Sequence, residues 1–305
     1  MAGKTMYVWP ESLIAPIAFT QLLLQKEGSG DYKDFWCDPE SKIYQFLGQD
    51  NVYFYTLMQG SMWLATQDNP QKLPKAGELQ LTEVFGSQHL QINNEKMSKS
   101  TGNYYTGDQL IGEKGYDKDQ IRYFLSSLDL SESTSNFSFE LLDEKNKFLA
   151  GPMNASFEKP ISACVQKFGG IIPKGELHEK VAKETTKVIQ RYLGNMPKSN
   201  HMVLLGAIEN YARLVNSMFS QYKPHDDRHD ETDRNNALYS CFYVLKNVMI
   251  MLYPFVPSTM HRLRRSLNLP ESVFRLEELA TGIKSGHQIG EMNQYFPNAE
   301  ENSPS

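Results

Sequence analysis

Two lysines that stand three residues apart lie in a polar stretch that could bind a polyphosphate. Lys96 and Lys99 alternate with Ser98 and Ser100, and Gly102 follows them, so the stretch supplies two ammonium groups and two hydroxyls beside a residue suited to turns. Such donors bind phosphate oxygens, and two cations can stabilise charge on a transferring phosphate without any proton transfer. An isolated Lys-x-x-Lys pair is usually a solvated loop, so the spacing alone leaves both interpretations open.

The elements that must position this stretch alternate between strand and helix. Thr5–Val8 and Ile43–Leu47 are short runs of aromatic and branched residues, which predict strands. Ile14–Gln25 and Val52–Ala65 have apolar residues at helical spacing, and Leu81–Ile92 indicates a further strand pair. Alternation of this kind favours a parallel sheet with crossover helices, and therefore an α/β domain over residues 1–135.

The chain from residue 136 onward has a different hydrophobic pattern. Apolar residues recur at helical spacing over 204–219 and 238–252, and prolines follow the second run, which predicts two antiparallel helices of an all-α bundle. We expect this bundle to cover residues 136–285. Residues 286–305 are polar and lack helical periodicity, so we expect a return segment and an extended tail over the surface.

Composition excludes several classes of protein. With 40% hydrophobic and 22% charged residues, the 305-residue chain should fold, and its net charge of −5 argues against an indiscriminate nucleic-acid coat. Cys37, Cys164 and Cys241 are too scattered for a disulfide framework or a structural zinc site, so no metal site is expected. No segment has the length and apolarity of a membrane helix. We therefore expect a soluble, reduced, cytoplasmic protein without a membrane partner.

The polar stretch also matches a known motif. Lys96-Met97-Ser98-Lys99-Ser100, followed by Gly102-Asn103, is identical to the KMSKS loop of class I aminoacyl-tRNA synthetases. Around it, the chain resembles the C-terminal half of methionyl-tRNA synthetases over about residues 3–298. The segments that carry this resemblance are Met6–Trp9 (the family's YVW strand), Ile43–Val52 (its YxFxGKD strand and turn), Asp117–Phe124, Phe168–Gly170 and Gly286–Gly290. It implies the second half of a Rossmann-like catalytic domain, followed by an α-helical bundle of the anticodon-binding type.

The resemblance also implies a reaction and its residues. In this family an amino-acid carboxylate attacks the α-phosphate of Mg²⁺-bound ATP, and the resulting aminoacyl-adenylate is transferred to tRNA. Lys96 and Lys99 would be catalytic, stabilising charge on the phosphates. The ATP-binding set implied by the match comprises Gly48, Asp50, Lys96, Met97, Ser98, Lys99 and Ser100. Asp50 stands where the family binds the adenosine ribose, and a carboxylate can accept hydrogen bonds from both ribose hydroxyls.

The amino-acid pocket departs from the family pattern. The match places Trp9, Asn51 and Tyr55 in this pocket, with Tyr55 in place of a histidine and Pro16 in place of a tyrosine. Exchanging the polar groups that orient a substrate changes selectivity, so we expect a pocket that is wider or differently polar. Gln49, in place of a lysine, makes the neighbouring turn less basic.

The anticodon-binding residues have changed as well. Placement without gaps from Phe168–Gly170 puts Lys159 at the family's arginine and Ala155 at its asparagine, while Tyr222 falls at its tryptophan. Lysine lacks the bidentate guanidinium, whereas tyrosine can still stack on a splayed base. Tyr222 could equally be a helix-end aromatic half in the core. The resemblance implies tRNA as a partner, with methionine tRNA as the family's own substrate.

The family's HIGH motif has no counterpart in this sequence. His287-Gln288-Ile289-Gly290 is similar in letters, but it follows the helical region in a polar segment, so we reject it. We therefore expect negligible amino-acid activation by this chain alone, and either a separate chain that carries the HIGH half or a self-dimer. Two alternatives stay open: a truncated, non-catalytic module that binds tRNA or protein, and a synthetase-like enzyme that activates another amino acid.

Overall fold

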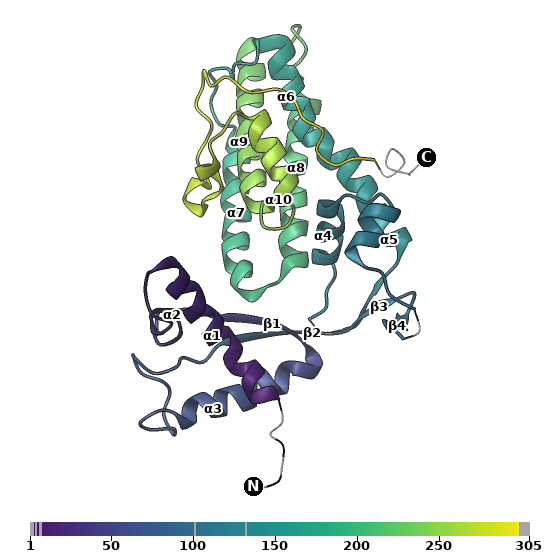
Figure 1. The fold of residues 1–305 in the computed structure, drawn as a ribbon. Coiled ribbons are helices and arrows are strands. Elements are labelled where there is room, and N and C mark those ends of the chain that lie inside the picture. The colour runs from purple at the N-terminus through teal and green to yellow at the C-terminus, as the bar shows by residue number, and fades with distance from the viewer. Residues whose placement is uncertain (1–2, 4, 6–7, 101, 132, 299–305) are drawn as a thin grey trace. The chain divides into compact units, whose positions relative to one another are not determined.

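The computed structural model describes residues 3, 5, 8–100, 102–131 and 133–298 and is mostly helical, with two small sheets (Figure 1). Packing divides the chain into two compact units. Unit 1 comprises Met1–Leu90 with Leu130–Ser135, and unit 2 comprises Gln91–Asp129 with Asn136–Ser305. The division falls at residue 90 rather than near 135, because the segment that carries Lys96 packs with the helical part of the chain.

Unit 1 contains a strand–helix–strand crossover. Its elements are α1 (Trp9–Glu27), α2 (Lys33–Trp36), β1 (Tyr44–Gly48), a 3-10 turn (Gln49–Asn51), a π-helical turn (Phe54–Met58), α3 (Gln59–Ala65) and β2 (Glu83–Ser87). β1 and β2 pair in parallel, from Tyr44 opposite Glu83 to Gly48 opposite Ser87. The parallel pairing with a helical crossover that the sequence predicted is therefore confirmed for these two strands.

Two expectations for the strands of this region need comment. Residues 6 and 7 of the expected strand Thr5–Val8 lie outside the described residues, and α1 already begins at Trp9. The expected pair within Leu81–Ile92 is not a pair. β2 joins β1, whereas β3 (Leu90–Ile92) lies between β4 (Glu95–Lys96) and β5 (Ser135–Phe137) in a second sheet. Each strand finds its partner elsewhere, so proximity in sequence was misleading.

Unit 2 is built around helices, several of which begin at a side-chain N-cap. They are α4 (Lys118–Ser126), α5 (Phe139–Phe148), α6 (Asn154–Phe168), α7 (Glu179–Asn195), α8 (His201–Tyr222), α9 (Glu231–Leu252) and α10 (Pro257–Ser266). The side chains of Asp117, Ser138 and Asp230 accept backbone N–H groups at the starts of α4, α5 and α9. α8 and α9 pack side by side, as the sequence predicted (Figure 1). α9 is buried on nearly every side from Ala237 to Leu252.

The C-terminal segment from residue 286 packs against the core at two places. Residues 170–172 and 286–289 pair as an antiparallel bridge, which places the rejected His287–Gly290 stretch outside any helix. Tyr295 and Phe296 are 0% and 1% exposed, and Tyr295 packs edge-on against Phe157. The expectation of a tail over the surface was therefore wrong for Tyr295 and Phe296, the two aromatic side chains that anchor this polar segment to the core.

No helix among the described residues is long and apolar enough to cross a membrane.

Candidate active-site and RNA-binding residues

The lysine-rich stretch begins in a tight hairpin. Asn93 and Asn94 connect β3 to β4 with φ angles of 51° and 63°, a left-handed turn that asparagine tolerates well. Asn136 Oδ1 accepts the Asn94 N–H at 2.7 Å, and Gln91 lies opposite Lys96 in the ladder. Sheet pairing therefore fixes the backbone at Lys96.

The backbone then closes a short loop over residues 98–103. Ser98 N–H donates to the Asn103 carbonyl at 3.0 Å, and Gly102 N–H donates to the Lys99 carbonyl at 3.3 Å. The Asn103 side-chain amide donates to the Lys96 carbonyl at 3.2 Å, which links the loop back to the strand. The Ser98 and Ser100 hydroxyls lie 2.9 Å apart. Gly102 adopts φ +73°, which a residue with a side chain rarely does.

The two lysines are electrostatically available. Lys96 and Lys99 are exposed, and neither forms an ion pair with any described residue. By contrast, exposed Lys183 lies 2.6 Å from Glu179. Two ammonium groups without an ion pair among the described residues, on a loop held by backbone bonds and flanked by serine hydroxyls, can bind a polyphosphate without first breaking a salt bridge.

The predicted ribose-binding turn lies where β1 ends. Gly48 is the last residue of β1, and Asp50 and Asn51 form the turn that follows it. A Cβ added to Gly48 would lie 2.8 Å from Asp50 Oδ1, so glycine leaves space for this exposed carboxylate. Ligands of open α/β sheets bind outside the carboxyl ends of parallel strands, and this turn has that position.

The predicted amino-acid pocket residues gather in unit 1. Trp9 stacks on Phe54 with ring centroids 4.0 Å apart, and Tyr55 meets Trp9 edge-on at 6.4 Å. Asn51 lies one turn before Tyr55 on the same crossover. Sequence reasoning missed Phe54, although it directly precedes Tyr55 in the chain, and it missed buried Gln59, whose amide donates to the Leu13 carbonyl at 2.9 Å.

The predicted RNA-binding residues lie on α6 and α8 and are tied to neighbours. Exposed Lys159 donates to Asn216 Oδ1 at 2.8 Å. The Tyr222 hydroxyl lies 2.7 Å from His178 Nε2, and the half-buried Tyr222 ring packs against the core. His178 also caps the N-terminus of α7. Nothing in the local sequence indicates His178 as a partner, because it lies 44 positions from Tyr222.

The predicted residues thus divide between the units. Trp9, Gly48, Asp50, Asn51 and Tyr55 belong to unit 1, whereas the 96–100 loop, Lys159 and Tyr222 belong to unit 2.

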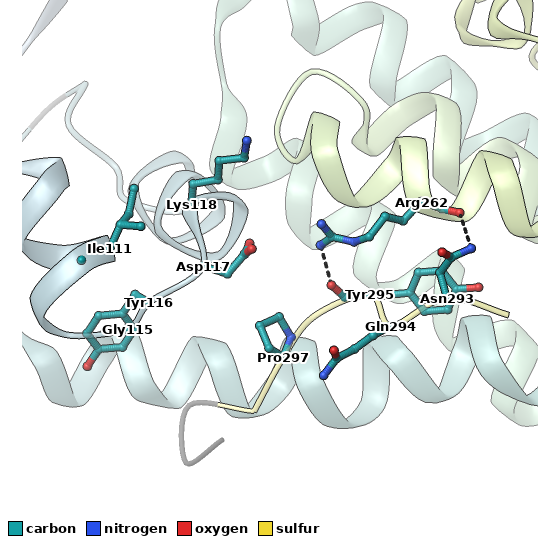
Figure 2. A pocket seen from close by; sticks show the side chains of 11 residues that line it. Ile111, Gly115, Tyr116, Asp117, Lys118, Arg262, Asn293, Gln294, Tyr295 and Pro297 are labelled. Carbon is teal, nitrogen blue, oxygen red and sulfur yellow. Dashed lines mark hydrogen bonds between the residues drawn. The ribbon is translucent and has the colours of Figure 1, made fainter. Parts of the chain in front are cut away.

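A cavity of 710 Å³ in unit 2 contains none of the predicted residues. It lies between the segment that precedes α4 and the C-terminal segment, with Lys118 and Arg262 on its walls (Figure 2). The Arg262 guanidinium donates to the Tyr295 carbonyl at 2.6 Å and to Thr259 Oγ1 at 2.9 Å. These bonds give Arg262 a structural task, namely to fix the C-terminal segment on α10.

Comparison with known proteins identifies the family. A family model described as "tRNA synthetases class I (M)" matches residues 1–155, slightly more than half of the chain. The chain belongs to this synthetase family. A methionine–tRNA ligase of Methanothrix thermoacetophila is 26% identical over 98% of this chain and 43% of its own length. Methionine–tRNA ligase 1 of Bacillus cereus is 26% identical over 87% of this chain and 47% of its own length.

The fold agrees with this membership. The crystal structure of Mycobacterium tuberculosis methionyl-tRNA synthetase bound by methionyl-adenylate superposes with a TM-score of 0.79 and 19% sequence identity. The match covers 96% of this chain and 56% of that chain. The chain spans less than half the length of the two curated relatives named above.

The synthetase family uses ATP. Across the described parts of the chain, no group of three or more His, Cys, Asp and Glu side chains is placed to hold a metal ion. The three cysteines are buried and unpaired.

Proposed function

We propose that this chain takes part in ATP-dependent amino-acid activation and tRNA aminoacylation of the methionine–tRNA ligase type. The observation that carries the proposal is the 96–100 loop, whose two lysines are exposed, unpaired among described residues and held by backbone bonds. Membership in the synthetase family supports it. Mg²⁺ would arrive bound to ATP.

The loop's chemical task is electrostatic. When an amino-acid carboxylate attacks the α-phosphate, negative charge develops on the phosphates that leave as pyrophosphate. In this proposal Lys96 and Lys99 stabilise that charge. The hydroxyls of Ser98 and Ser100 and the backbone around Met97 bind ATP in the same loop. Fixed cations aimed at developing charge accelerate such a step because they need no reorganisation at the moment of reaction.

Unit 1 is assigned the remaining small-molecule contacts. Asp50 would accept hydrogen bonds from the ribose hydroxyls, with Gly48 leaving space for its carboxylate. Trp9 and Tyr55 lie together with Asn51 nearby in sequence, which supports a role for this group in holding the amino acid.

The helical unit is assigned tRNA binding. Lys159 would contact the RNA backbone, and Tyr222 would stack on a splayed base, with its hydroxyl fixed by His178. Because lysine replaces the family's arginine, we expect weaker discrimination between anticodons than a bidentate guanidinium provides.

We further propose that a polypeptide carrying the HIGH-type histidines completes the activity. The support is the aromatic face of the β1–β2 sheet, where Phe46 stacks on Phe85 and is still 63% exposed. Parallel sheets are normally covered on both faces. ATP–pyrophosphate exchange by the chain alone would contradict this proposal, whereas exchange that appears only after adding the amino-terminal half of the B. cereus relative would support it. A dimer in sedimentation at micromolar concentration would favour a second copy of this chain on that face.

The central test is calorimetric titration of the chain with ATP and magnesium. Changing Lys96→Ala and Lys99→Ala together removes two charge-assisted contacts, each worth about 1.5–3 kcal/mol, so we expect affinity to fall by more than about a hundredfold. Lys180→Ala with Lys183→Ala is the matched control, since these exposed lysines have the same spacing and charge on α7. Equal affinity in all three proteins, or no ATP binding at all, would favour the non-catalytic binding module.

A further inference from the structure

The helix α1 carries apolar side chains on two opposite sides. Leu13 and Leu24 are buried, whereas Phe19 is 66% exposed and Leu22 is 62% exposed. A helix that is apolar on both sides is normally covered on both, and an exposed apolar patch marks an interaction surface. Residues two positions apart lie on nearly opposite sides of a helix, so the set that faces away from Leu13 and Leu24, here called the outer stripe, comprises Glu11, Ala15, Ala18, Phe19, Leu22 and Lys26.

The outer stripe combines small and large side chains in a self-complementary order. Two copies of α1 can pair antiparallel about a two-fold axis that passes between Ala18 and Phe19. Each Ala18 then lies opposite Phe19 of the other copy, and each Ala15 lies opposite Leu22. An alanine leaves room for the large side chain that it faces, so the two helices can approach to about 8–10 Å. The stripe is therefore complementary in shape to a second copy of itself.

The charges at the two ends of the outer stripe fit the same pairing. Glu11 lies in the first turn of α1 and Lys26 in its last turn; both are exposed, and neither forms an ion pair with a described residue. In the antiparallel pair, Glu11 of each copy lies opposite Lys26 of the other, so opposite charges meet at both ends. A parallel pair would place like charges together. Charge therefore favours the antiparallel orientation and its register.

We propose that the outer stripe is the interface of a homodimer in which the α1 helices of two copies pack antiparallel. The inference does not rest on the proposed aminoacylation, because neither the 96–100 loop nor Asp50 lies on α1. α1 has 19 residues and is about 28 Å long, so one helix pair gives an interface at the small end of specific ones. We therefore expect a dissociation constant on the order of micromolar.

Sedimentation velocity of the full chain over a range of micromolar concentrations tests this interface. We expect a reversible equilibrium between monomer and dimer, with the dimer dominant at the highest concentrations. Phe19→Glu places a charge at the centre of the interface twice per dimer, so it should raise the dissociation constant by more than about tenfold. Leu73→Glu is the matched control and should leave the constant unchanged, since Leu73 is an exposed apolar residue outside α1.

Exchange of the end charges tests the orientation of the two helices. Glu11→Lys alone or Lys26→Glu alone sets like charges against each other at both ends, so each variant should dimerise several-fold more weakly. An equimolar mixture of the two variants should recover the original affinity, because each end of the mixed dimer again joins opposite charges. High salt should reduce these differences, since the charges are exposed.

Four results would overturn the proposal. It fails if the chain stays monomeric over this range, if Phe19→Glu dimerises as well as Leu73→Glu, or if mixing the two charge variants restores nothing. It also fails if Phe46→Glu abolishes the dimer while Phe19→Glu retains it, because the second copy would then cover the β1–β2 sheet. Circular dichroism of each variant separates loss of fold from loss of association, and the exposed charge variants provide a test that does not depend on Phe19→Glu.

Discussion

Asp119 caps a helix that lies 140 residues away in the sequence. Its side chain is 0% exposed, and Oδ2 accepts the Thr259 N–H at 2.6 Å, at the start of α10. α10 has no capping side chain of its own. Since α4 follows the lysine-rich loop in the chain, this bond joins the loop-bearing segment to the helical core of unit 2.

Asp119→Ala should therefore be strongly destabilising. A buried N–H left unsatisfied costs about 1–3 kcal/mol, and loss of a carboxylate at a helix N-terminus costs up to about 2 kcal/mol more. We expect a total loss of about 2–4 kcal/mol, which lowers Tm by about 5–15 °C for a unit of about 200 residues. Asp119→Asn should cost less than Asp119→Ala, because its amide oxygen can still accept the Thr259 N–H and only the charge is lost.

Thermal and urea unfolding, followed by circular dichroism, measure these differences. Asp230→Ala is the matched control: Asp230 caps α9 at an exposed position by accepting the Asp233 N–H at 3.0 Å. Water can replace that cap, so about 1 kcal/mol is expected. The reasoning is refuted if Asp119→Ala costs no more than Asp230→Ala.

Three further predictions concern the site and the core. Gly48→Ala should weaken adenosine binding several-fold without a large change in Tm, because its Cβ would lie 2.8 Å from Asp50 Oδ1; unchanged affinity in calorimetry would contradict the ribose assignment. Tyr222→Ala should weaken tRNA binding by about 1–3 kcal/mol in filter-binding assays whereas Tyr222→Phe keeps most of it, and equal losses would argue against stacking. Burial raises the pKa of the Cys164 thiol to about 12 and also raises the pKa of the Cys37 and Cys241 thiols. The native protein at pH 8 should therefore not react with dithionitrobenzoate, and unfolding in urea should expose three reactive thiols; rapid reaction of the native protein would contradict this burial.

Local patterns were the predictable part of this structure. Helical periodicity predicted α8, which packs one apolar face, and the same reasoning extended to α9, which is apolar over most of its length. The strand–turn–helix pattern around Gly48 predicted β1 and its crossover. The contiguous motif Lys96–Ser100 pointed to a phosphate-binding loop, and the family comparison supports the synthetase relationship from which its role was inferred.

Contacts between distant residues could not be predicted. Asn154 and Phe296 exchange two hydrogen bonds across 142 residues, and nothing in their local sequence marks either as a partner. The same holds for buried Lys246, whose ammonium group donates to a Glu278 carboxylate oxygen at 2.6 Å. From the sequence alone, Lys246 is only a charged residue within an apolar helix. The buried Trp63 indole N–H has no acceptor among the described residues, which is also invisible in sequence, because it depends on which acceptors the fold has already used.

The most direct test of the central claim is to locate ATP on the protein by nuclear magnetic resonance. Backbone amide signals of a ¹⁵N-labelled, deuterated chain would be followed during titration with magnesium ATP and, separately, with tripolyphosphate. We predict saturable shifts at Lys96–Gly102 with both ligands, absent when Lys96 and Lys99 are changed to alanine. Shifts confined to other residues, or saturation that the double variant leaves unchanged, would contradict the assignment of this loop to the phosphates.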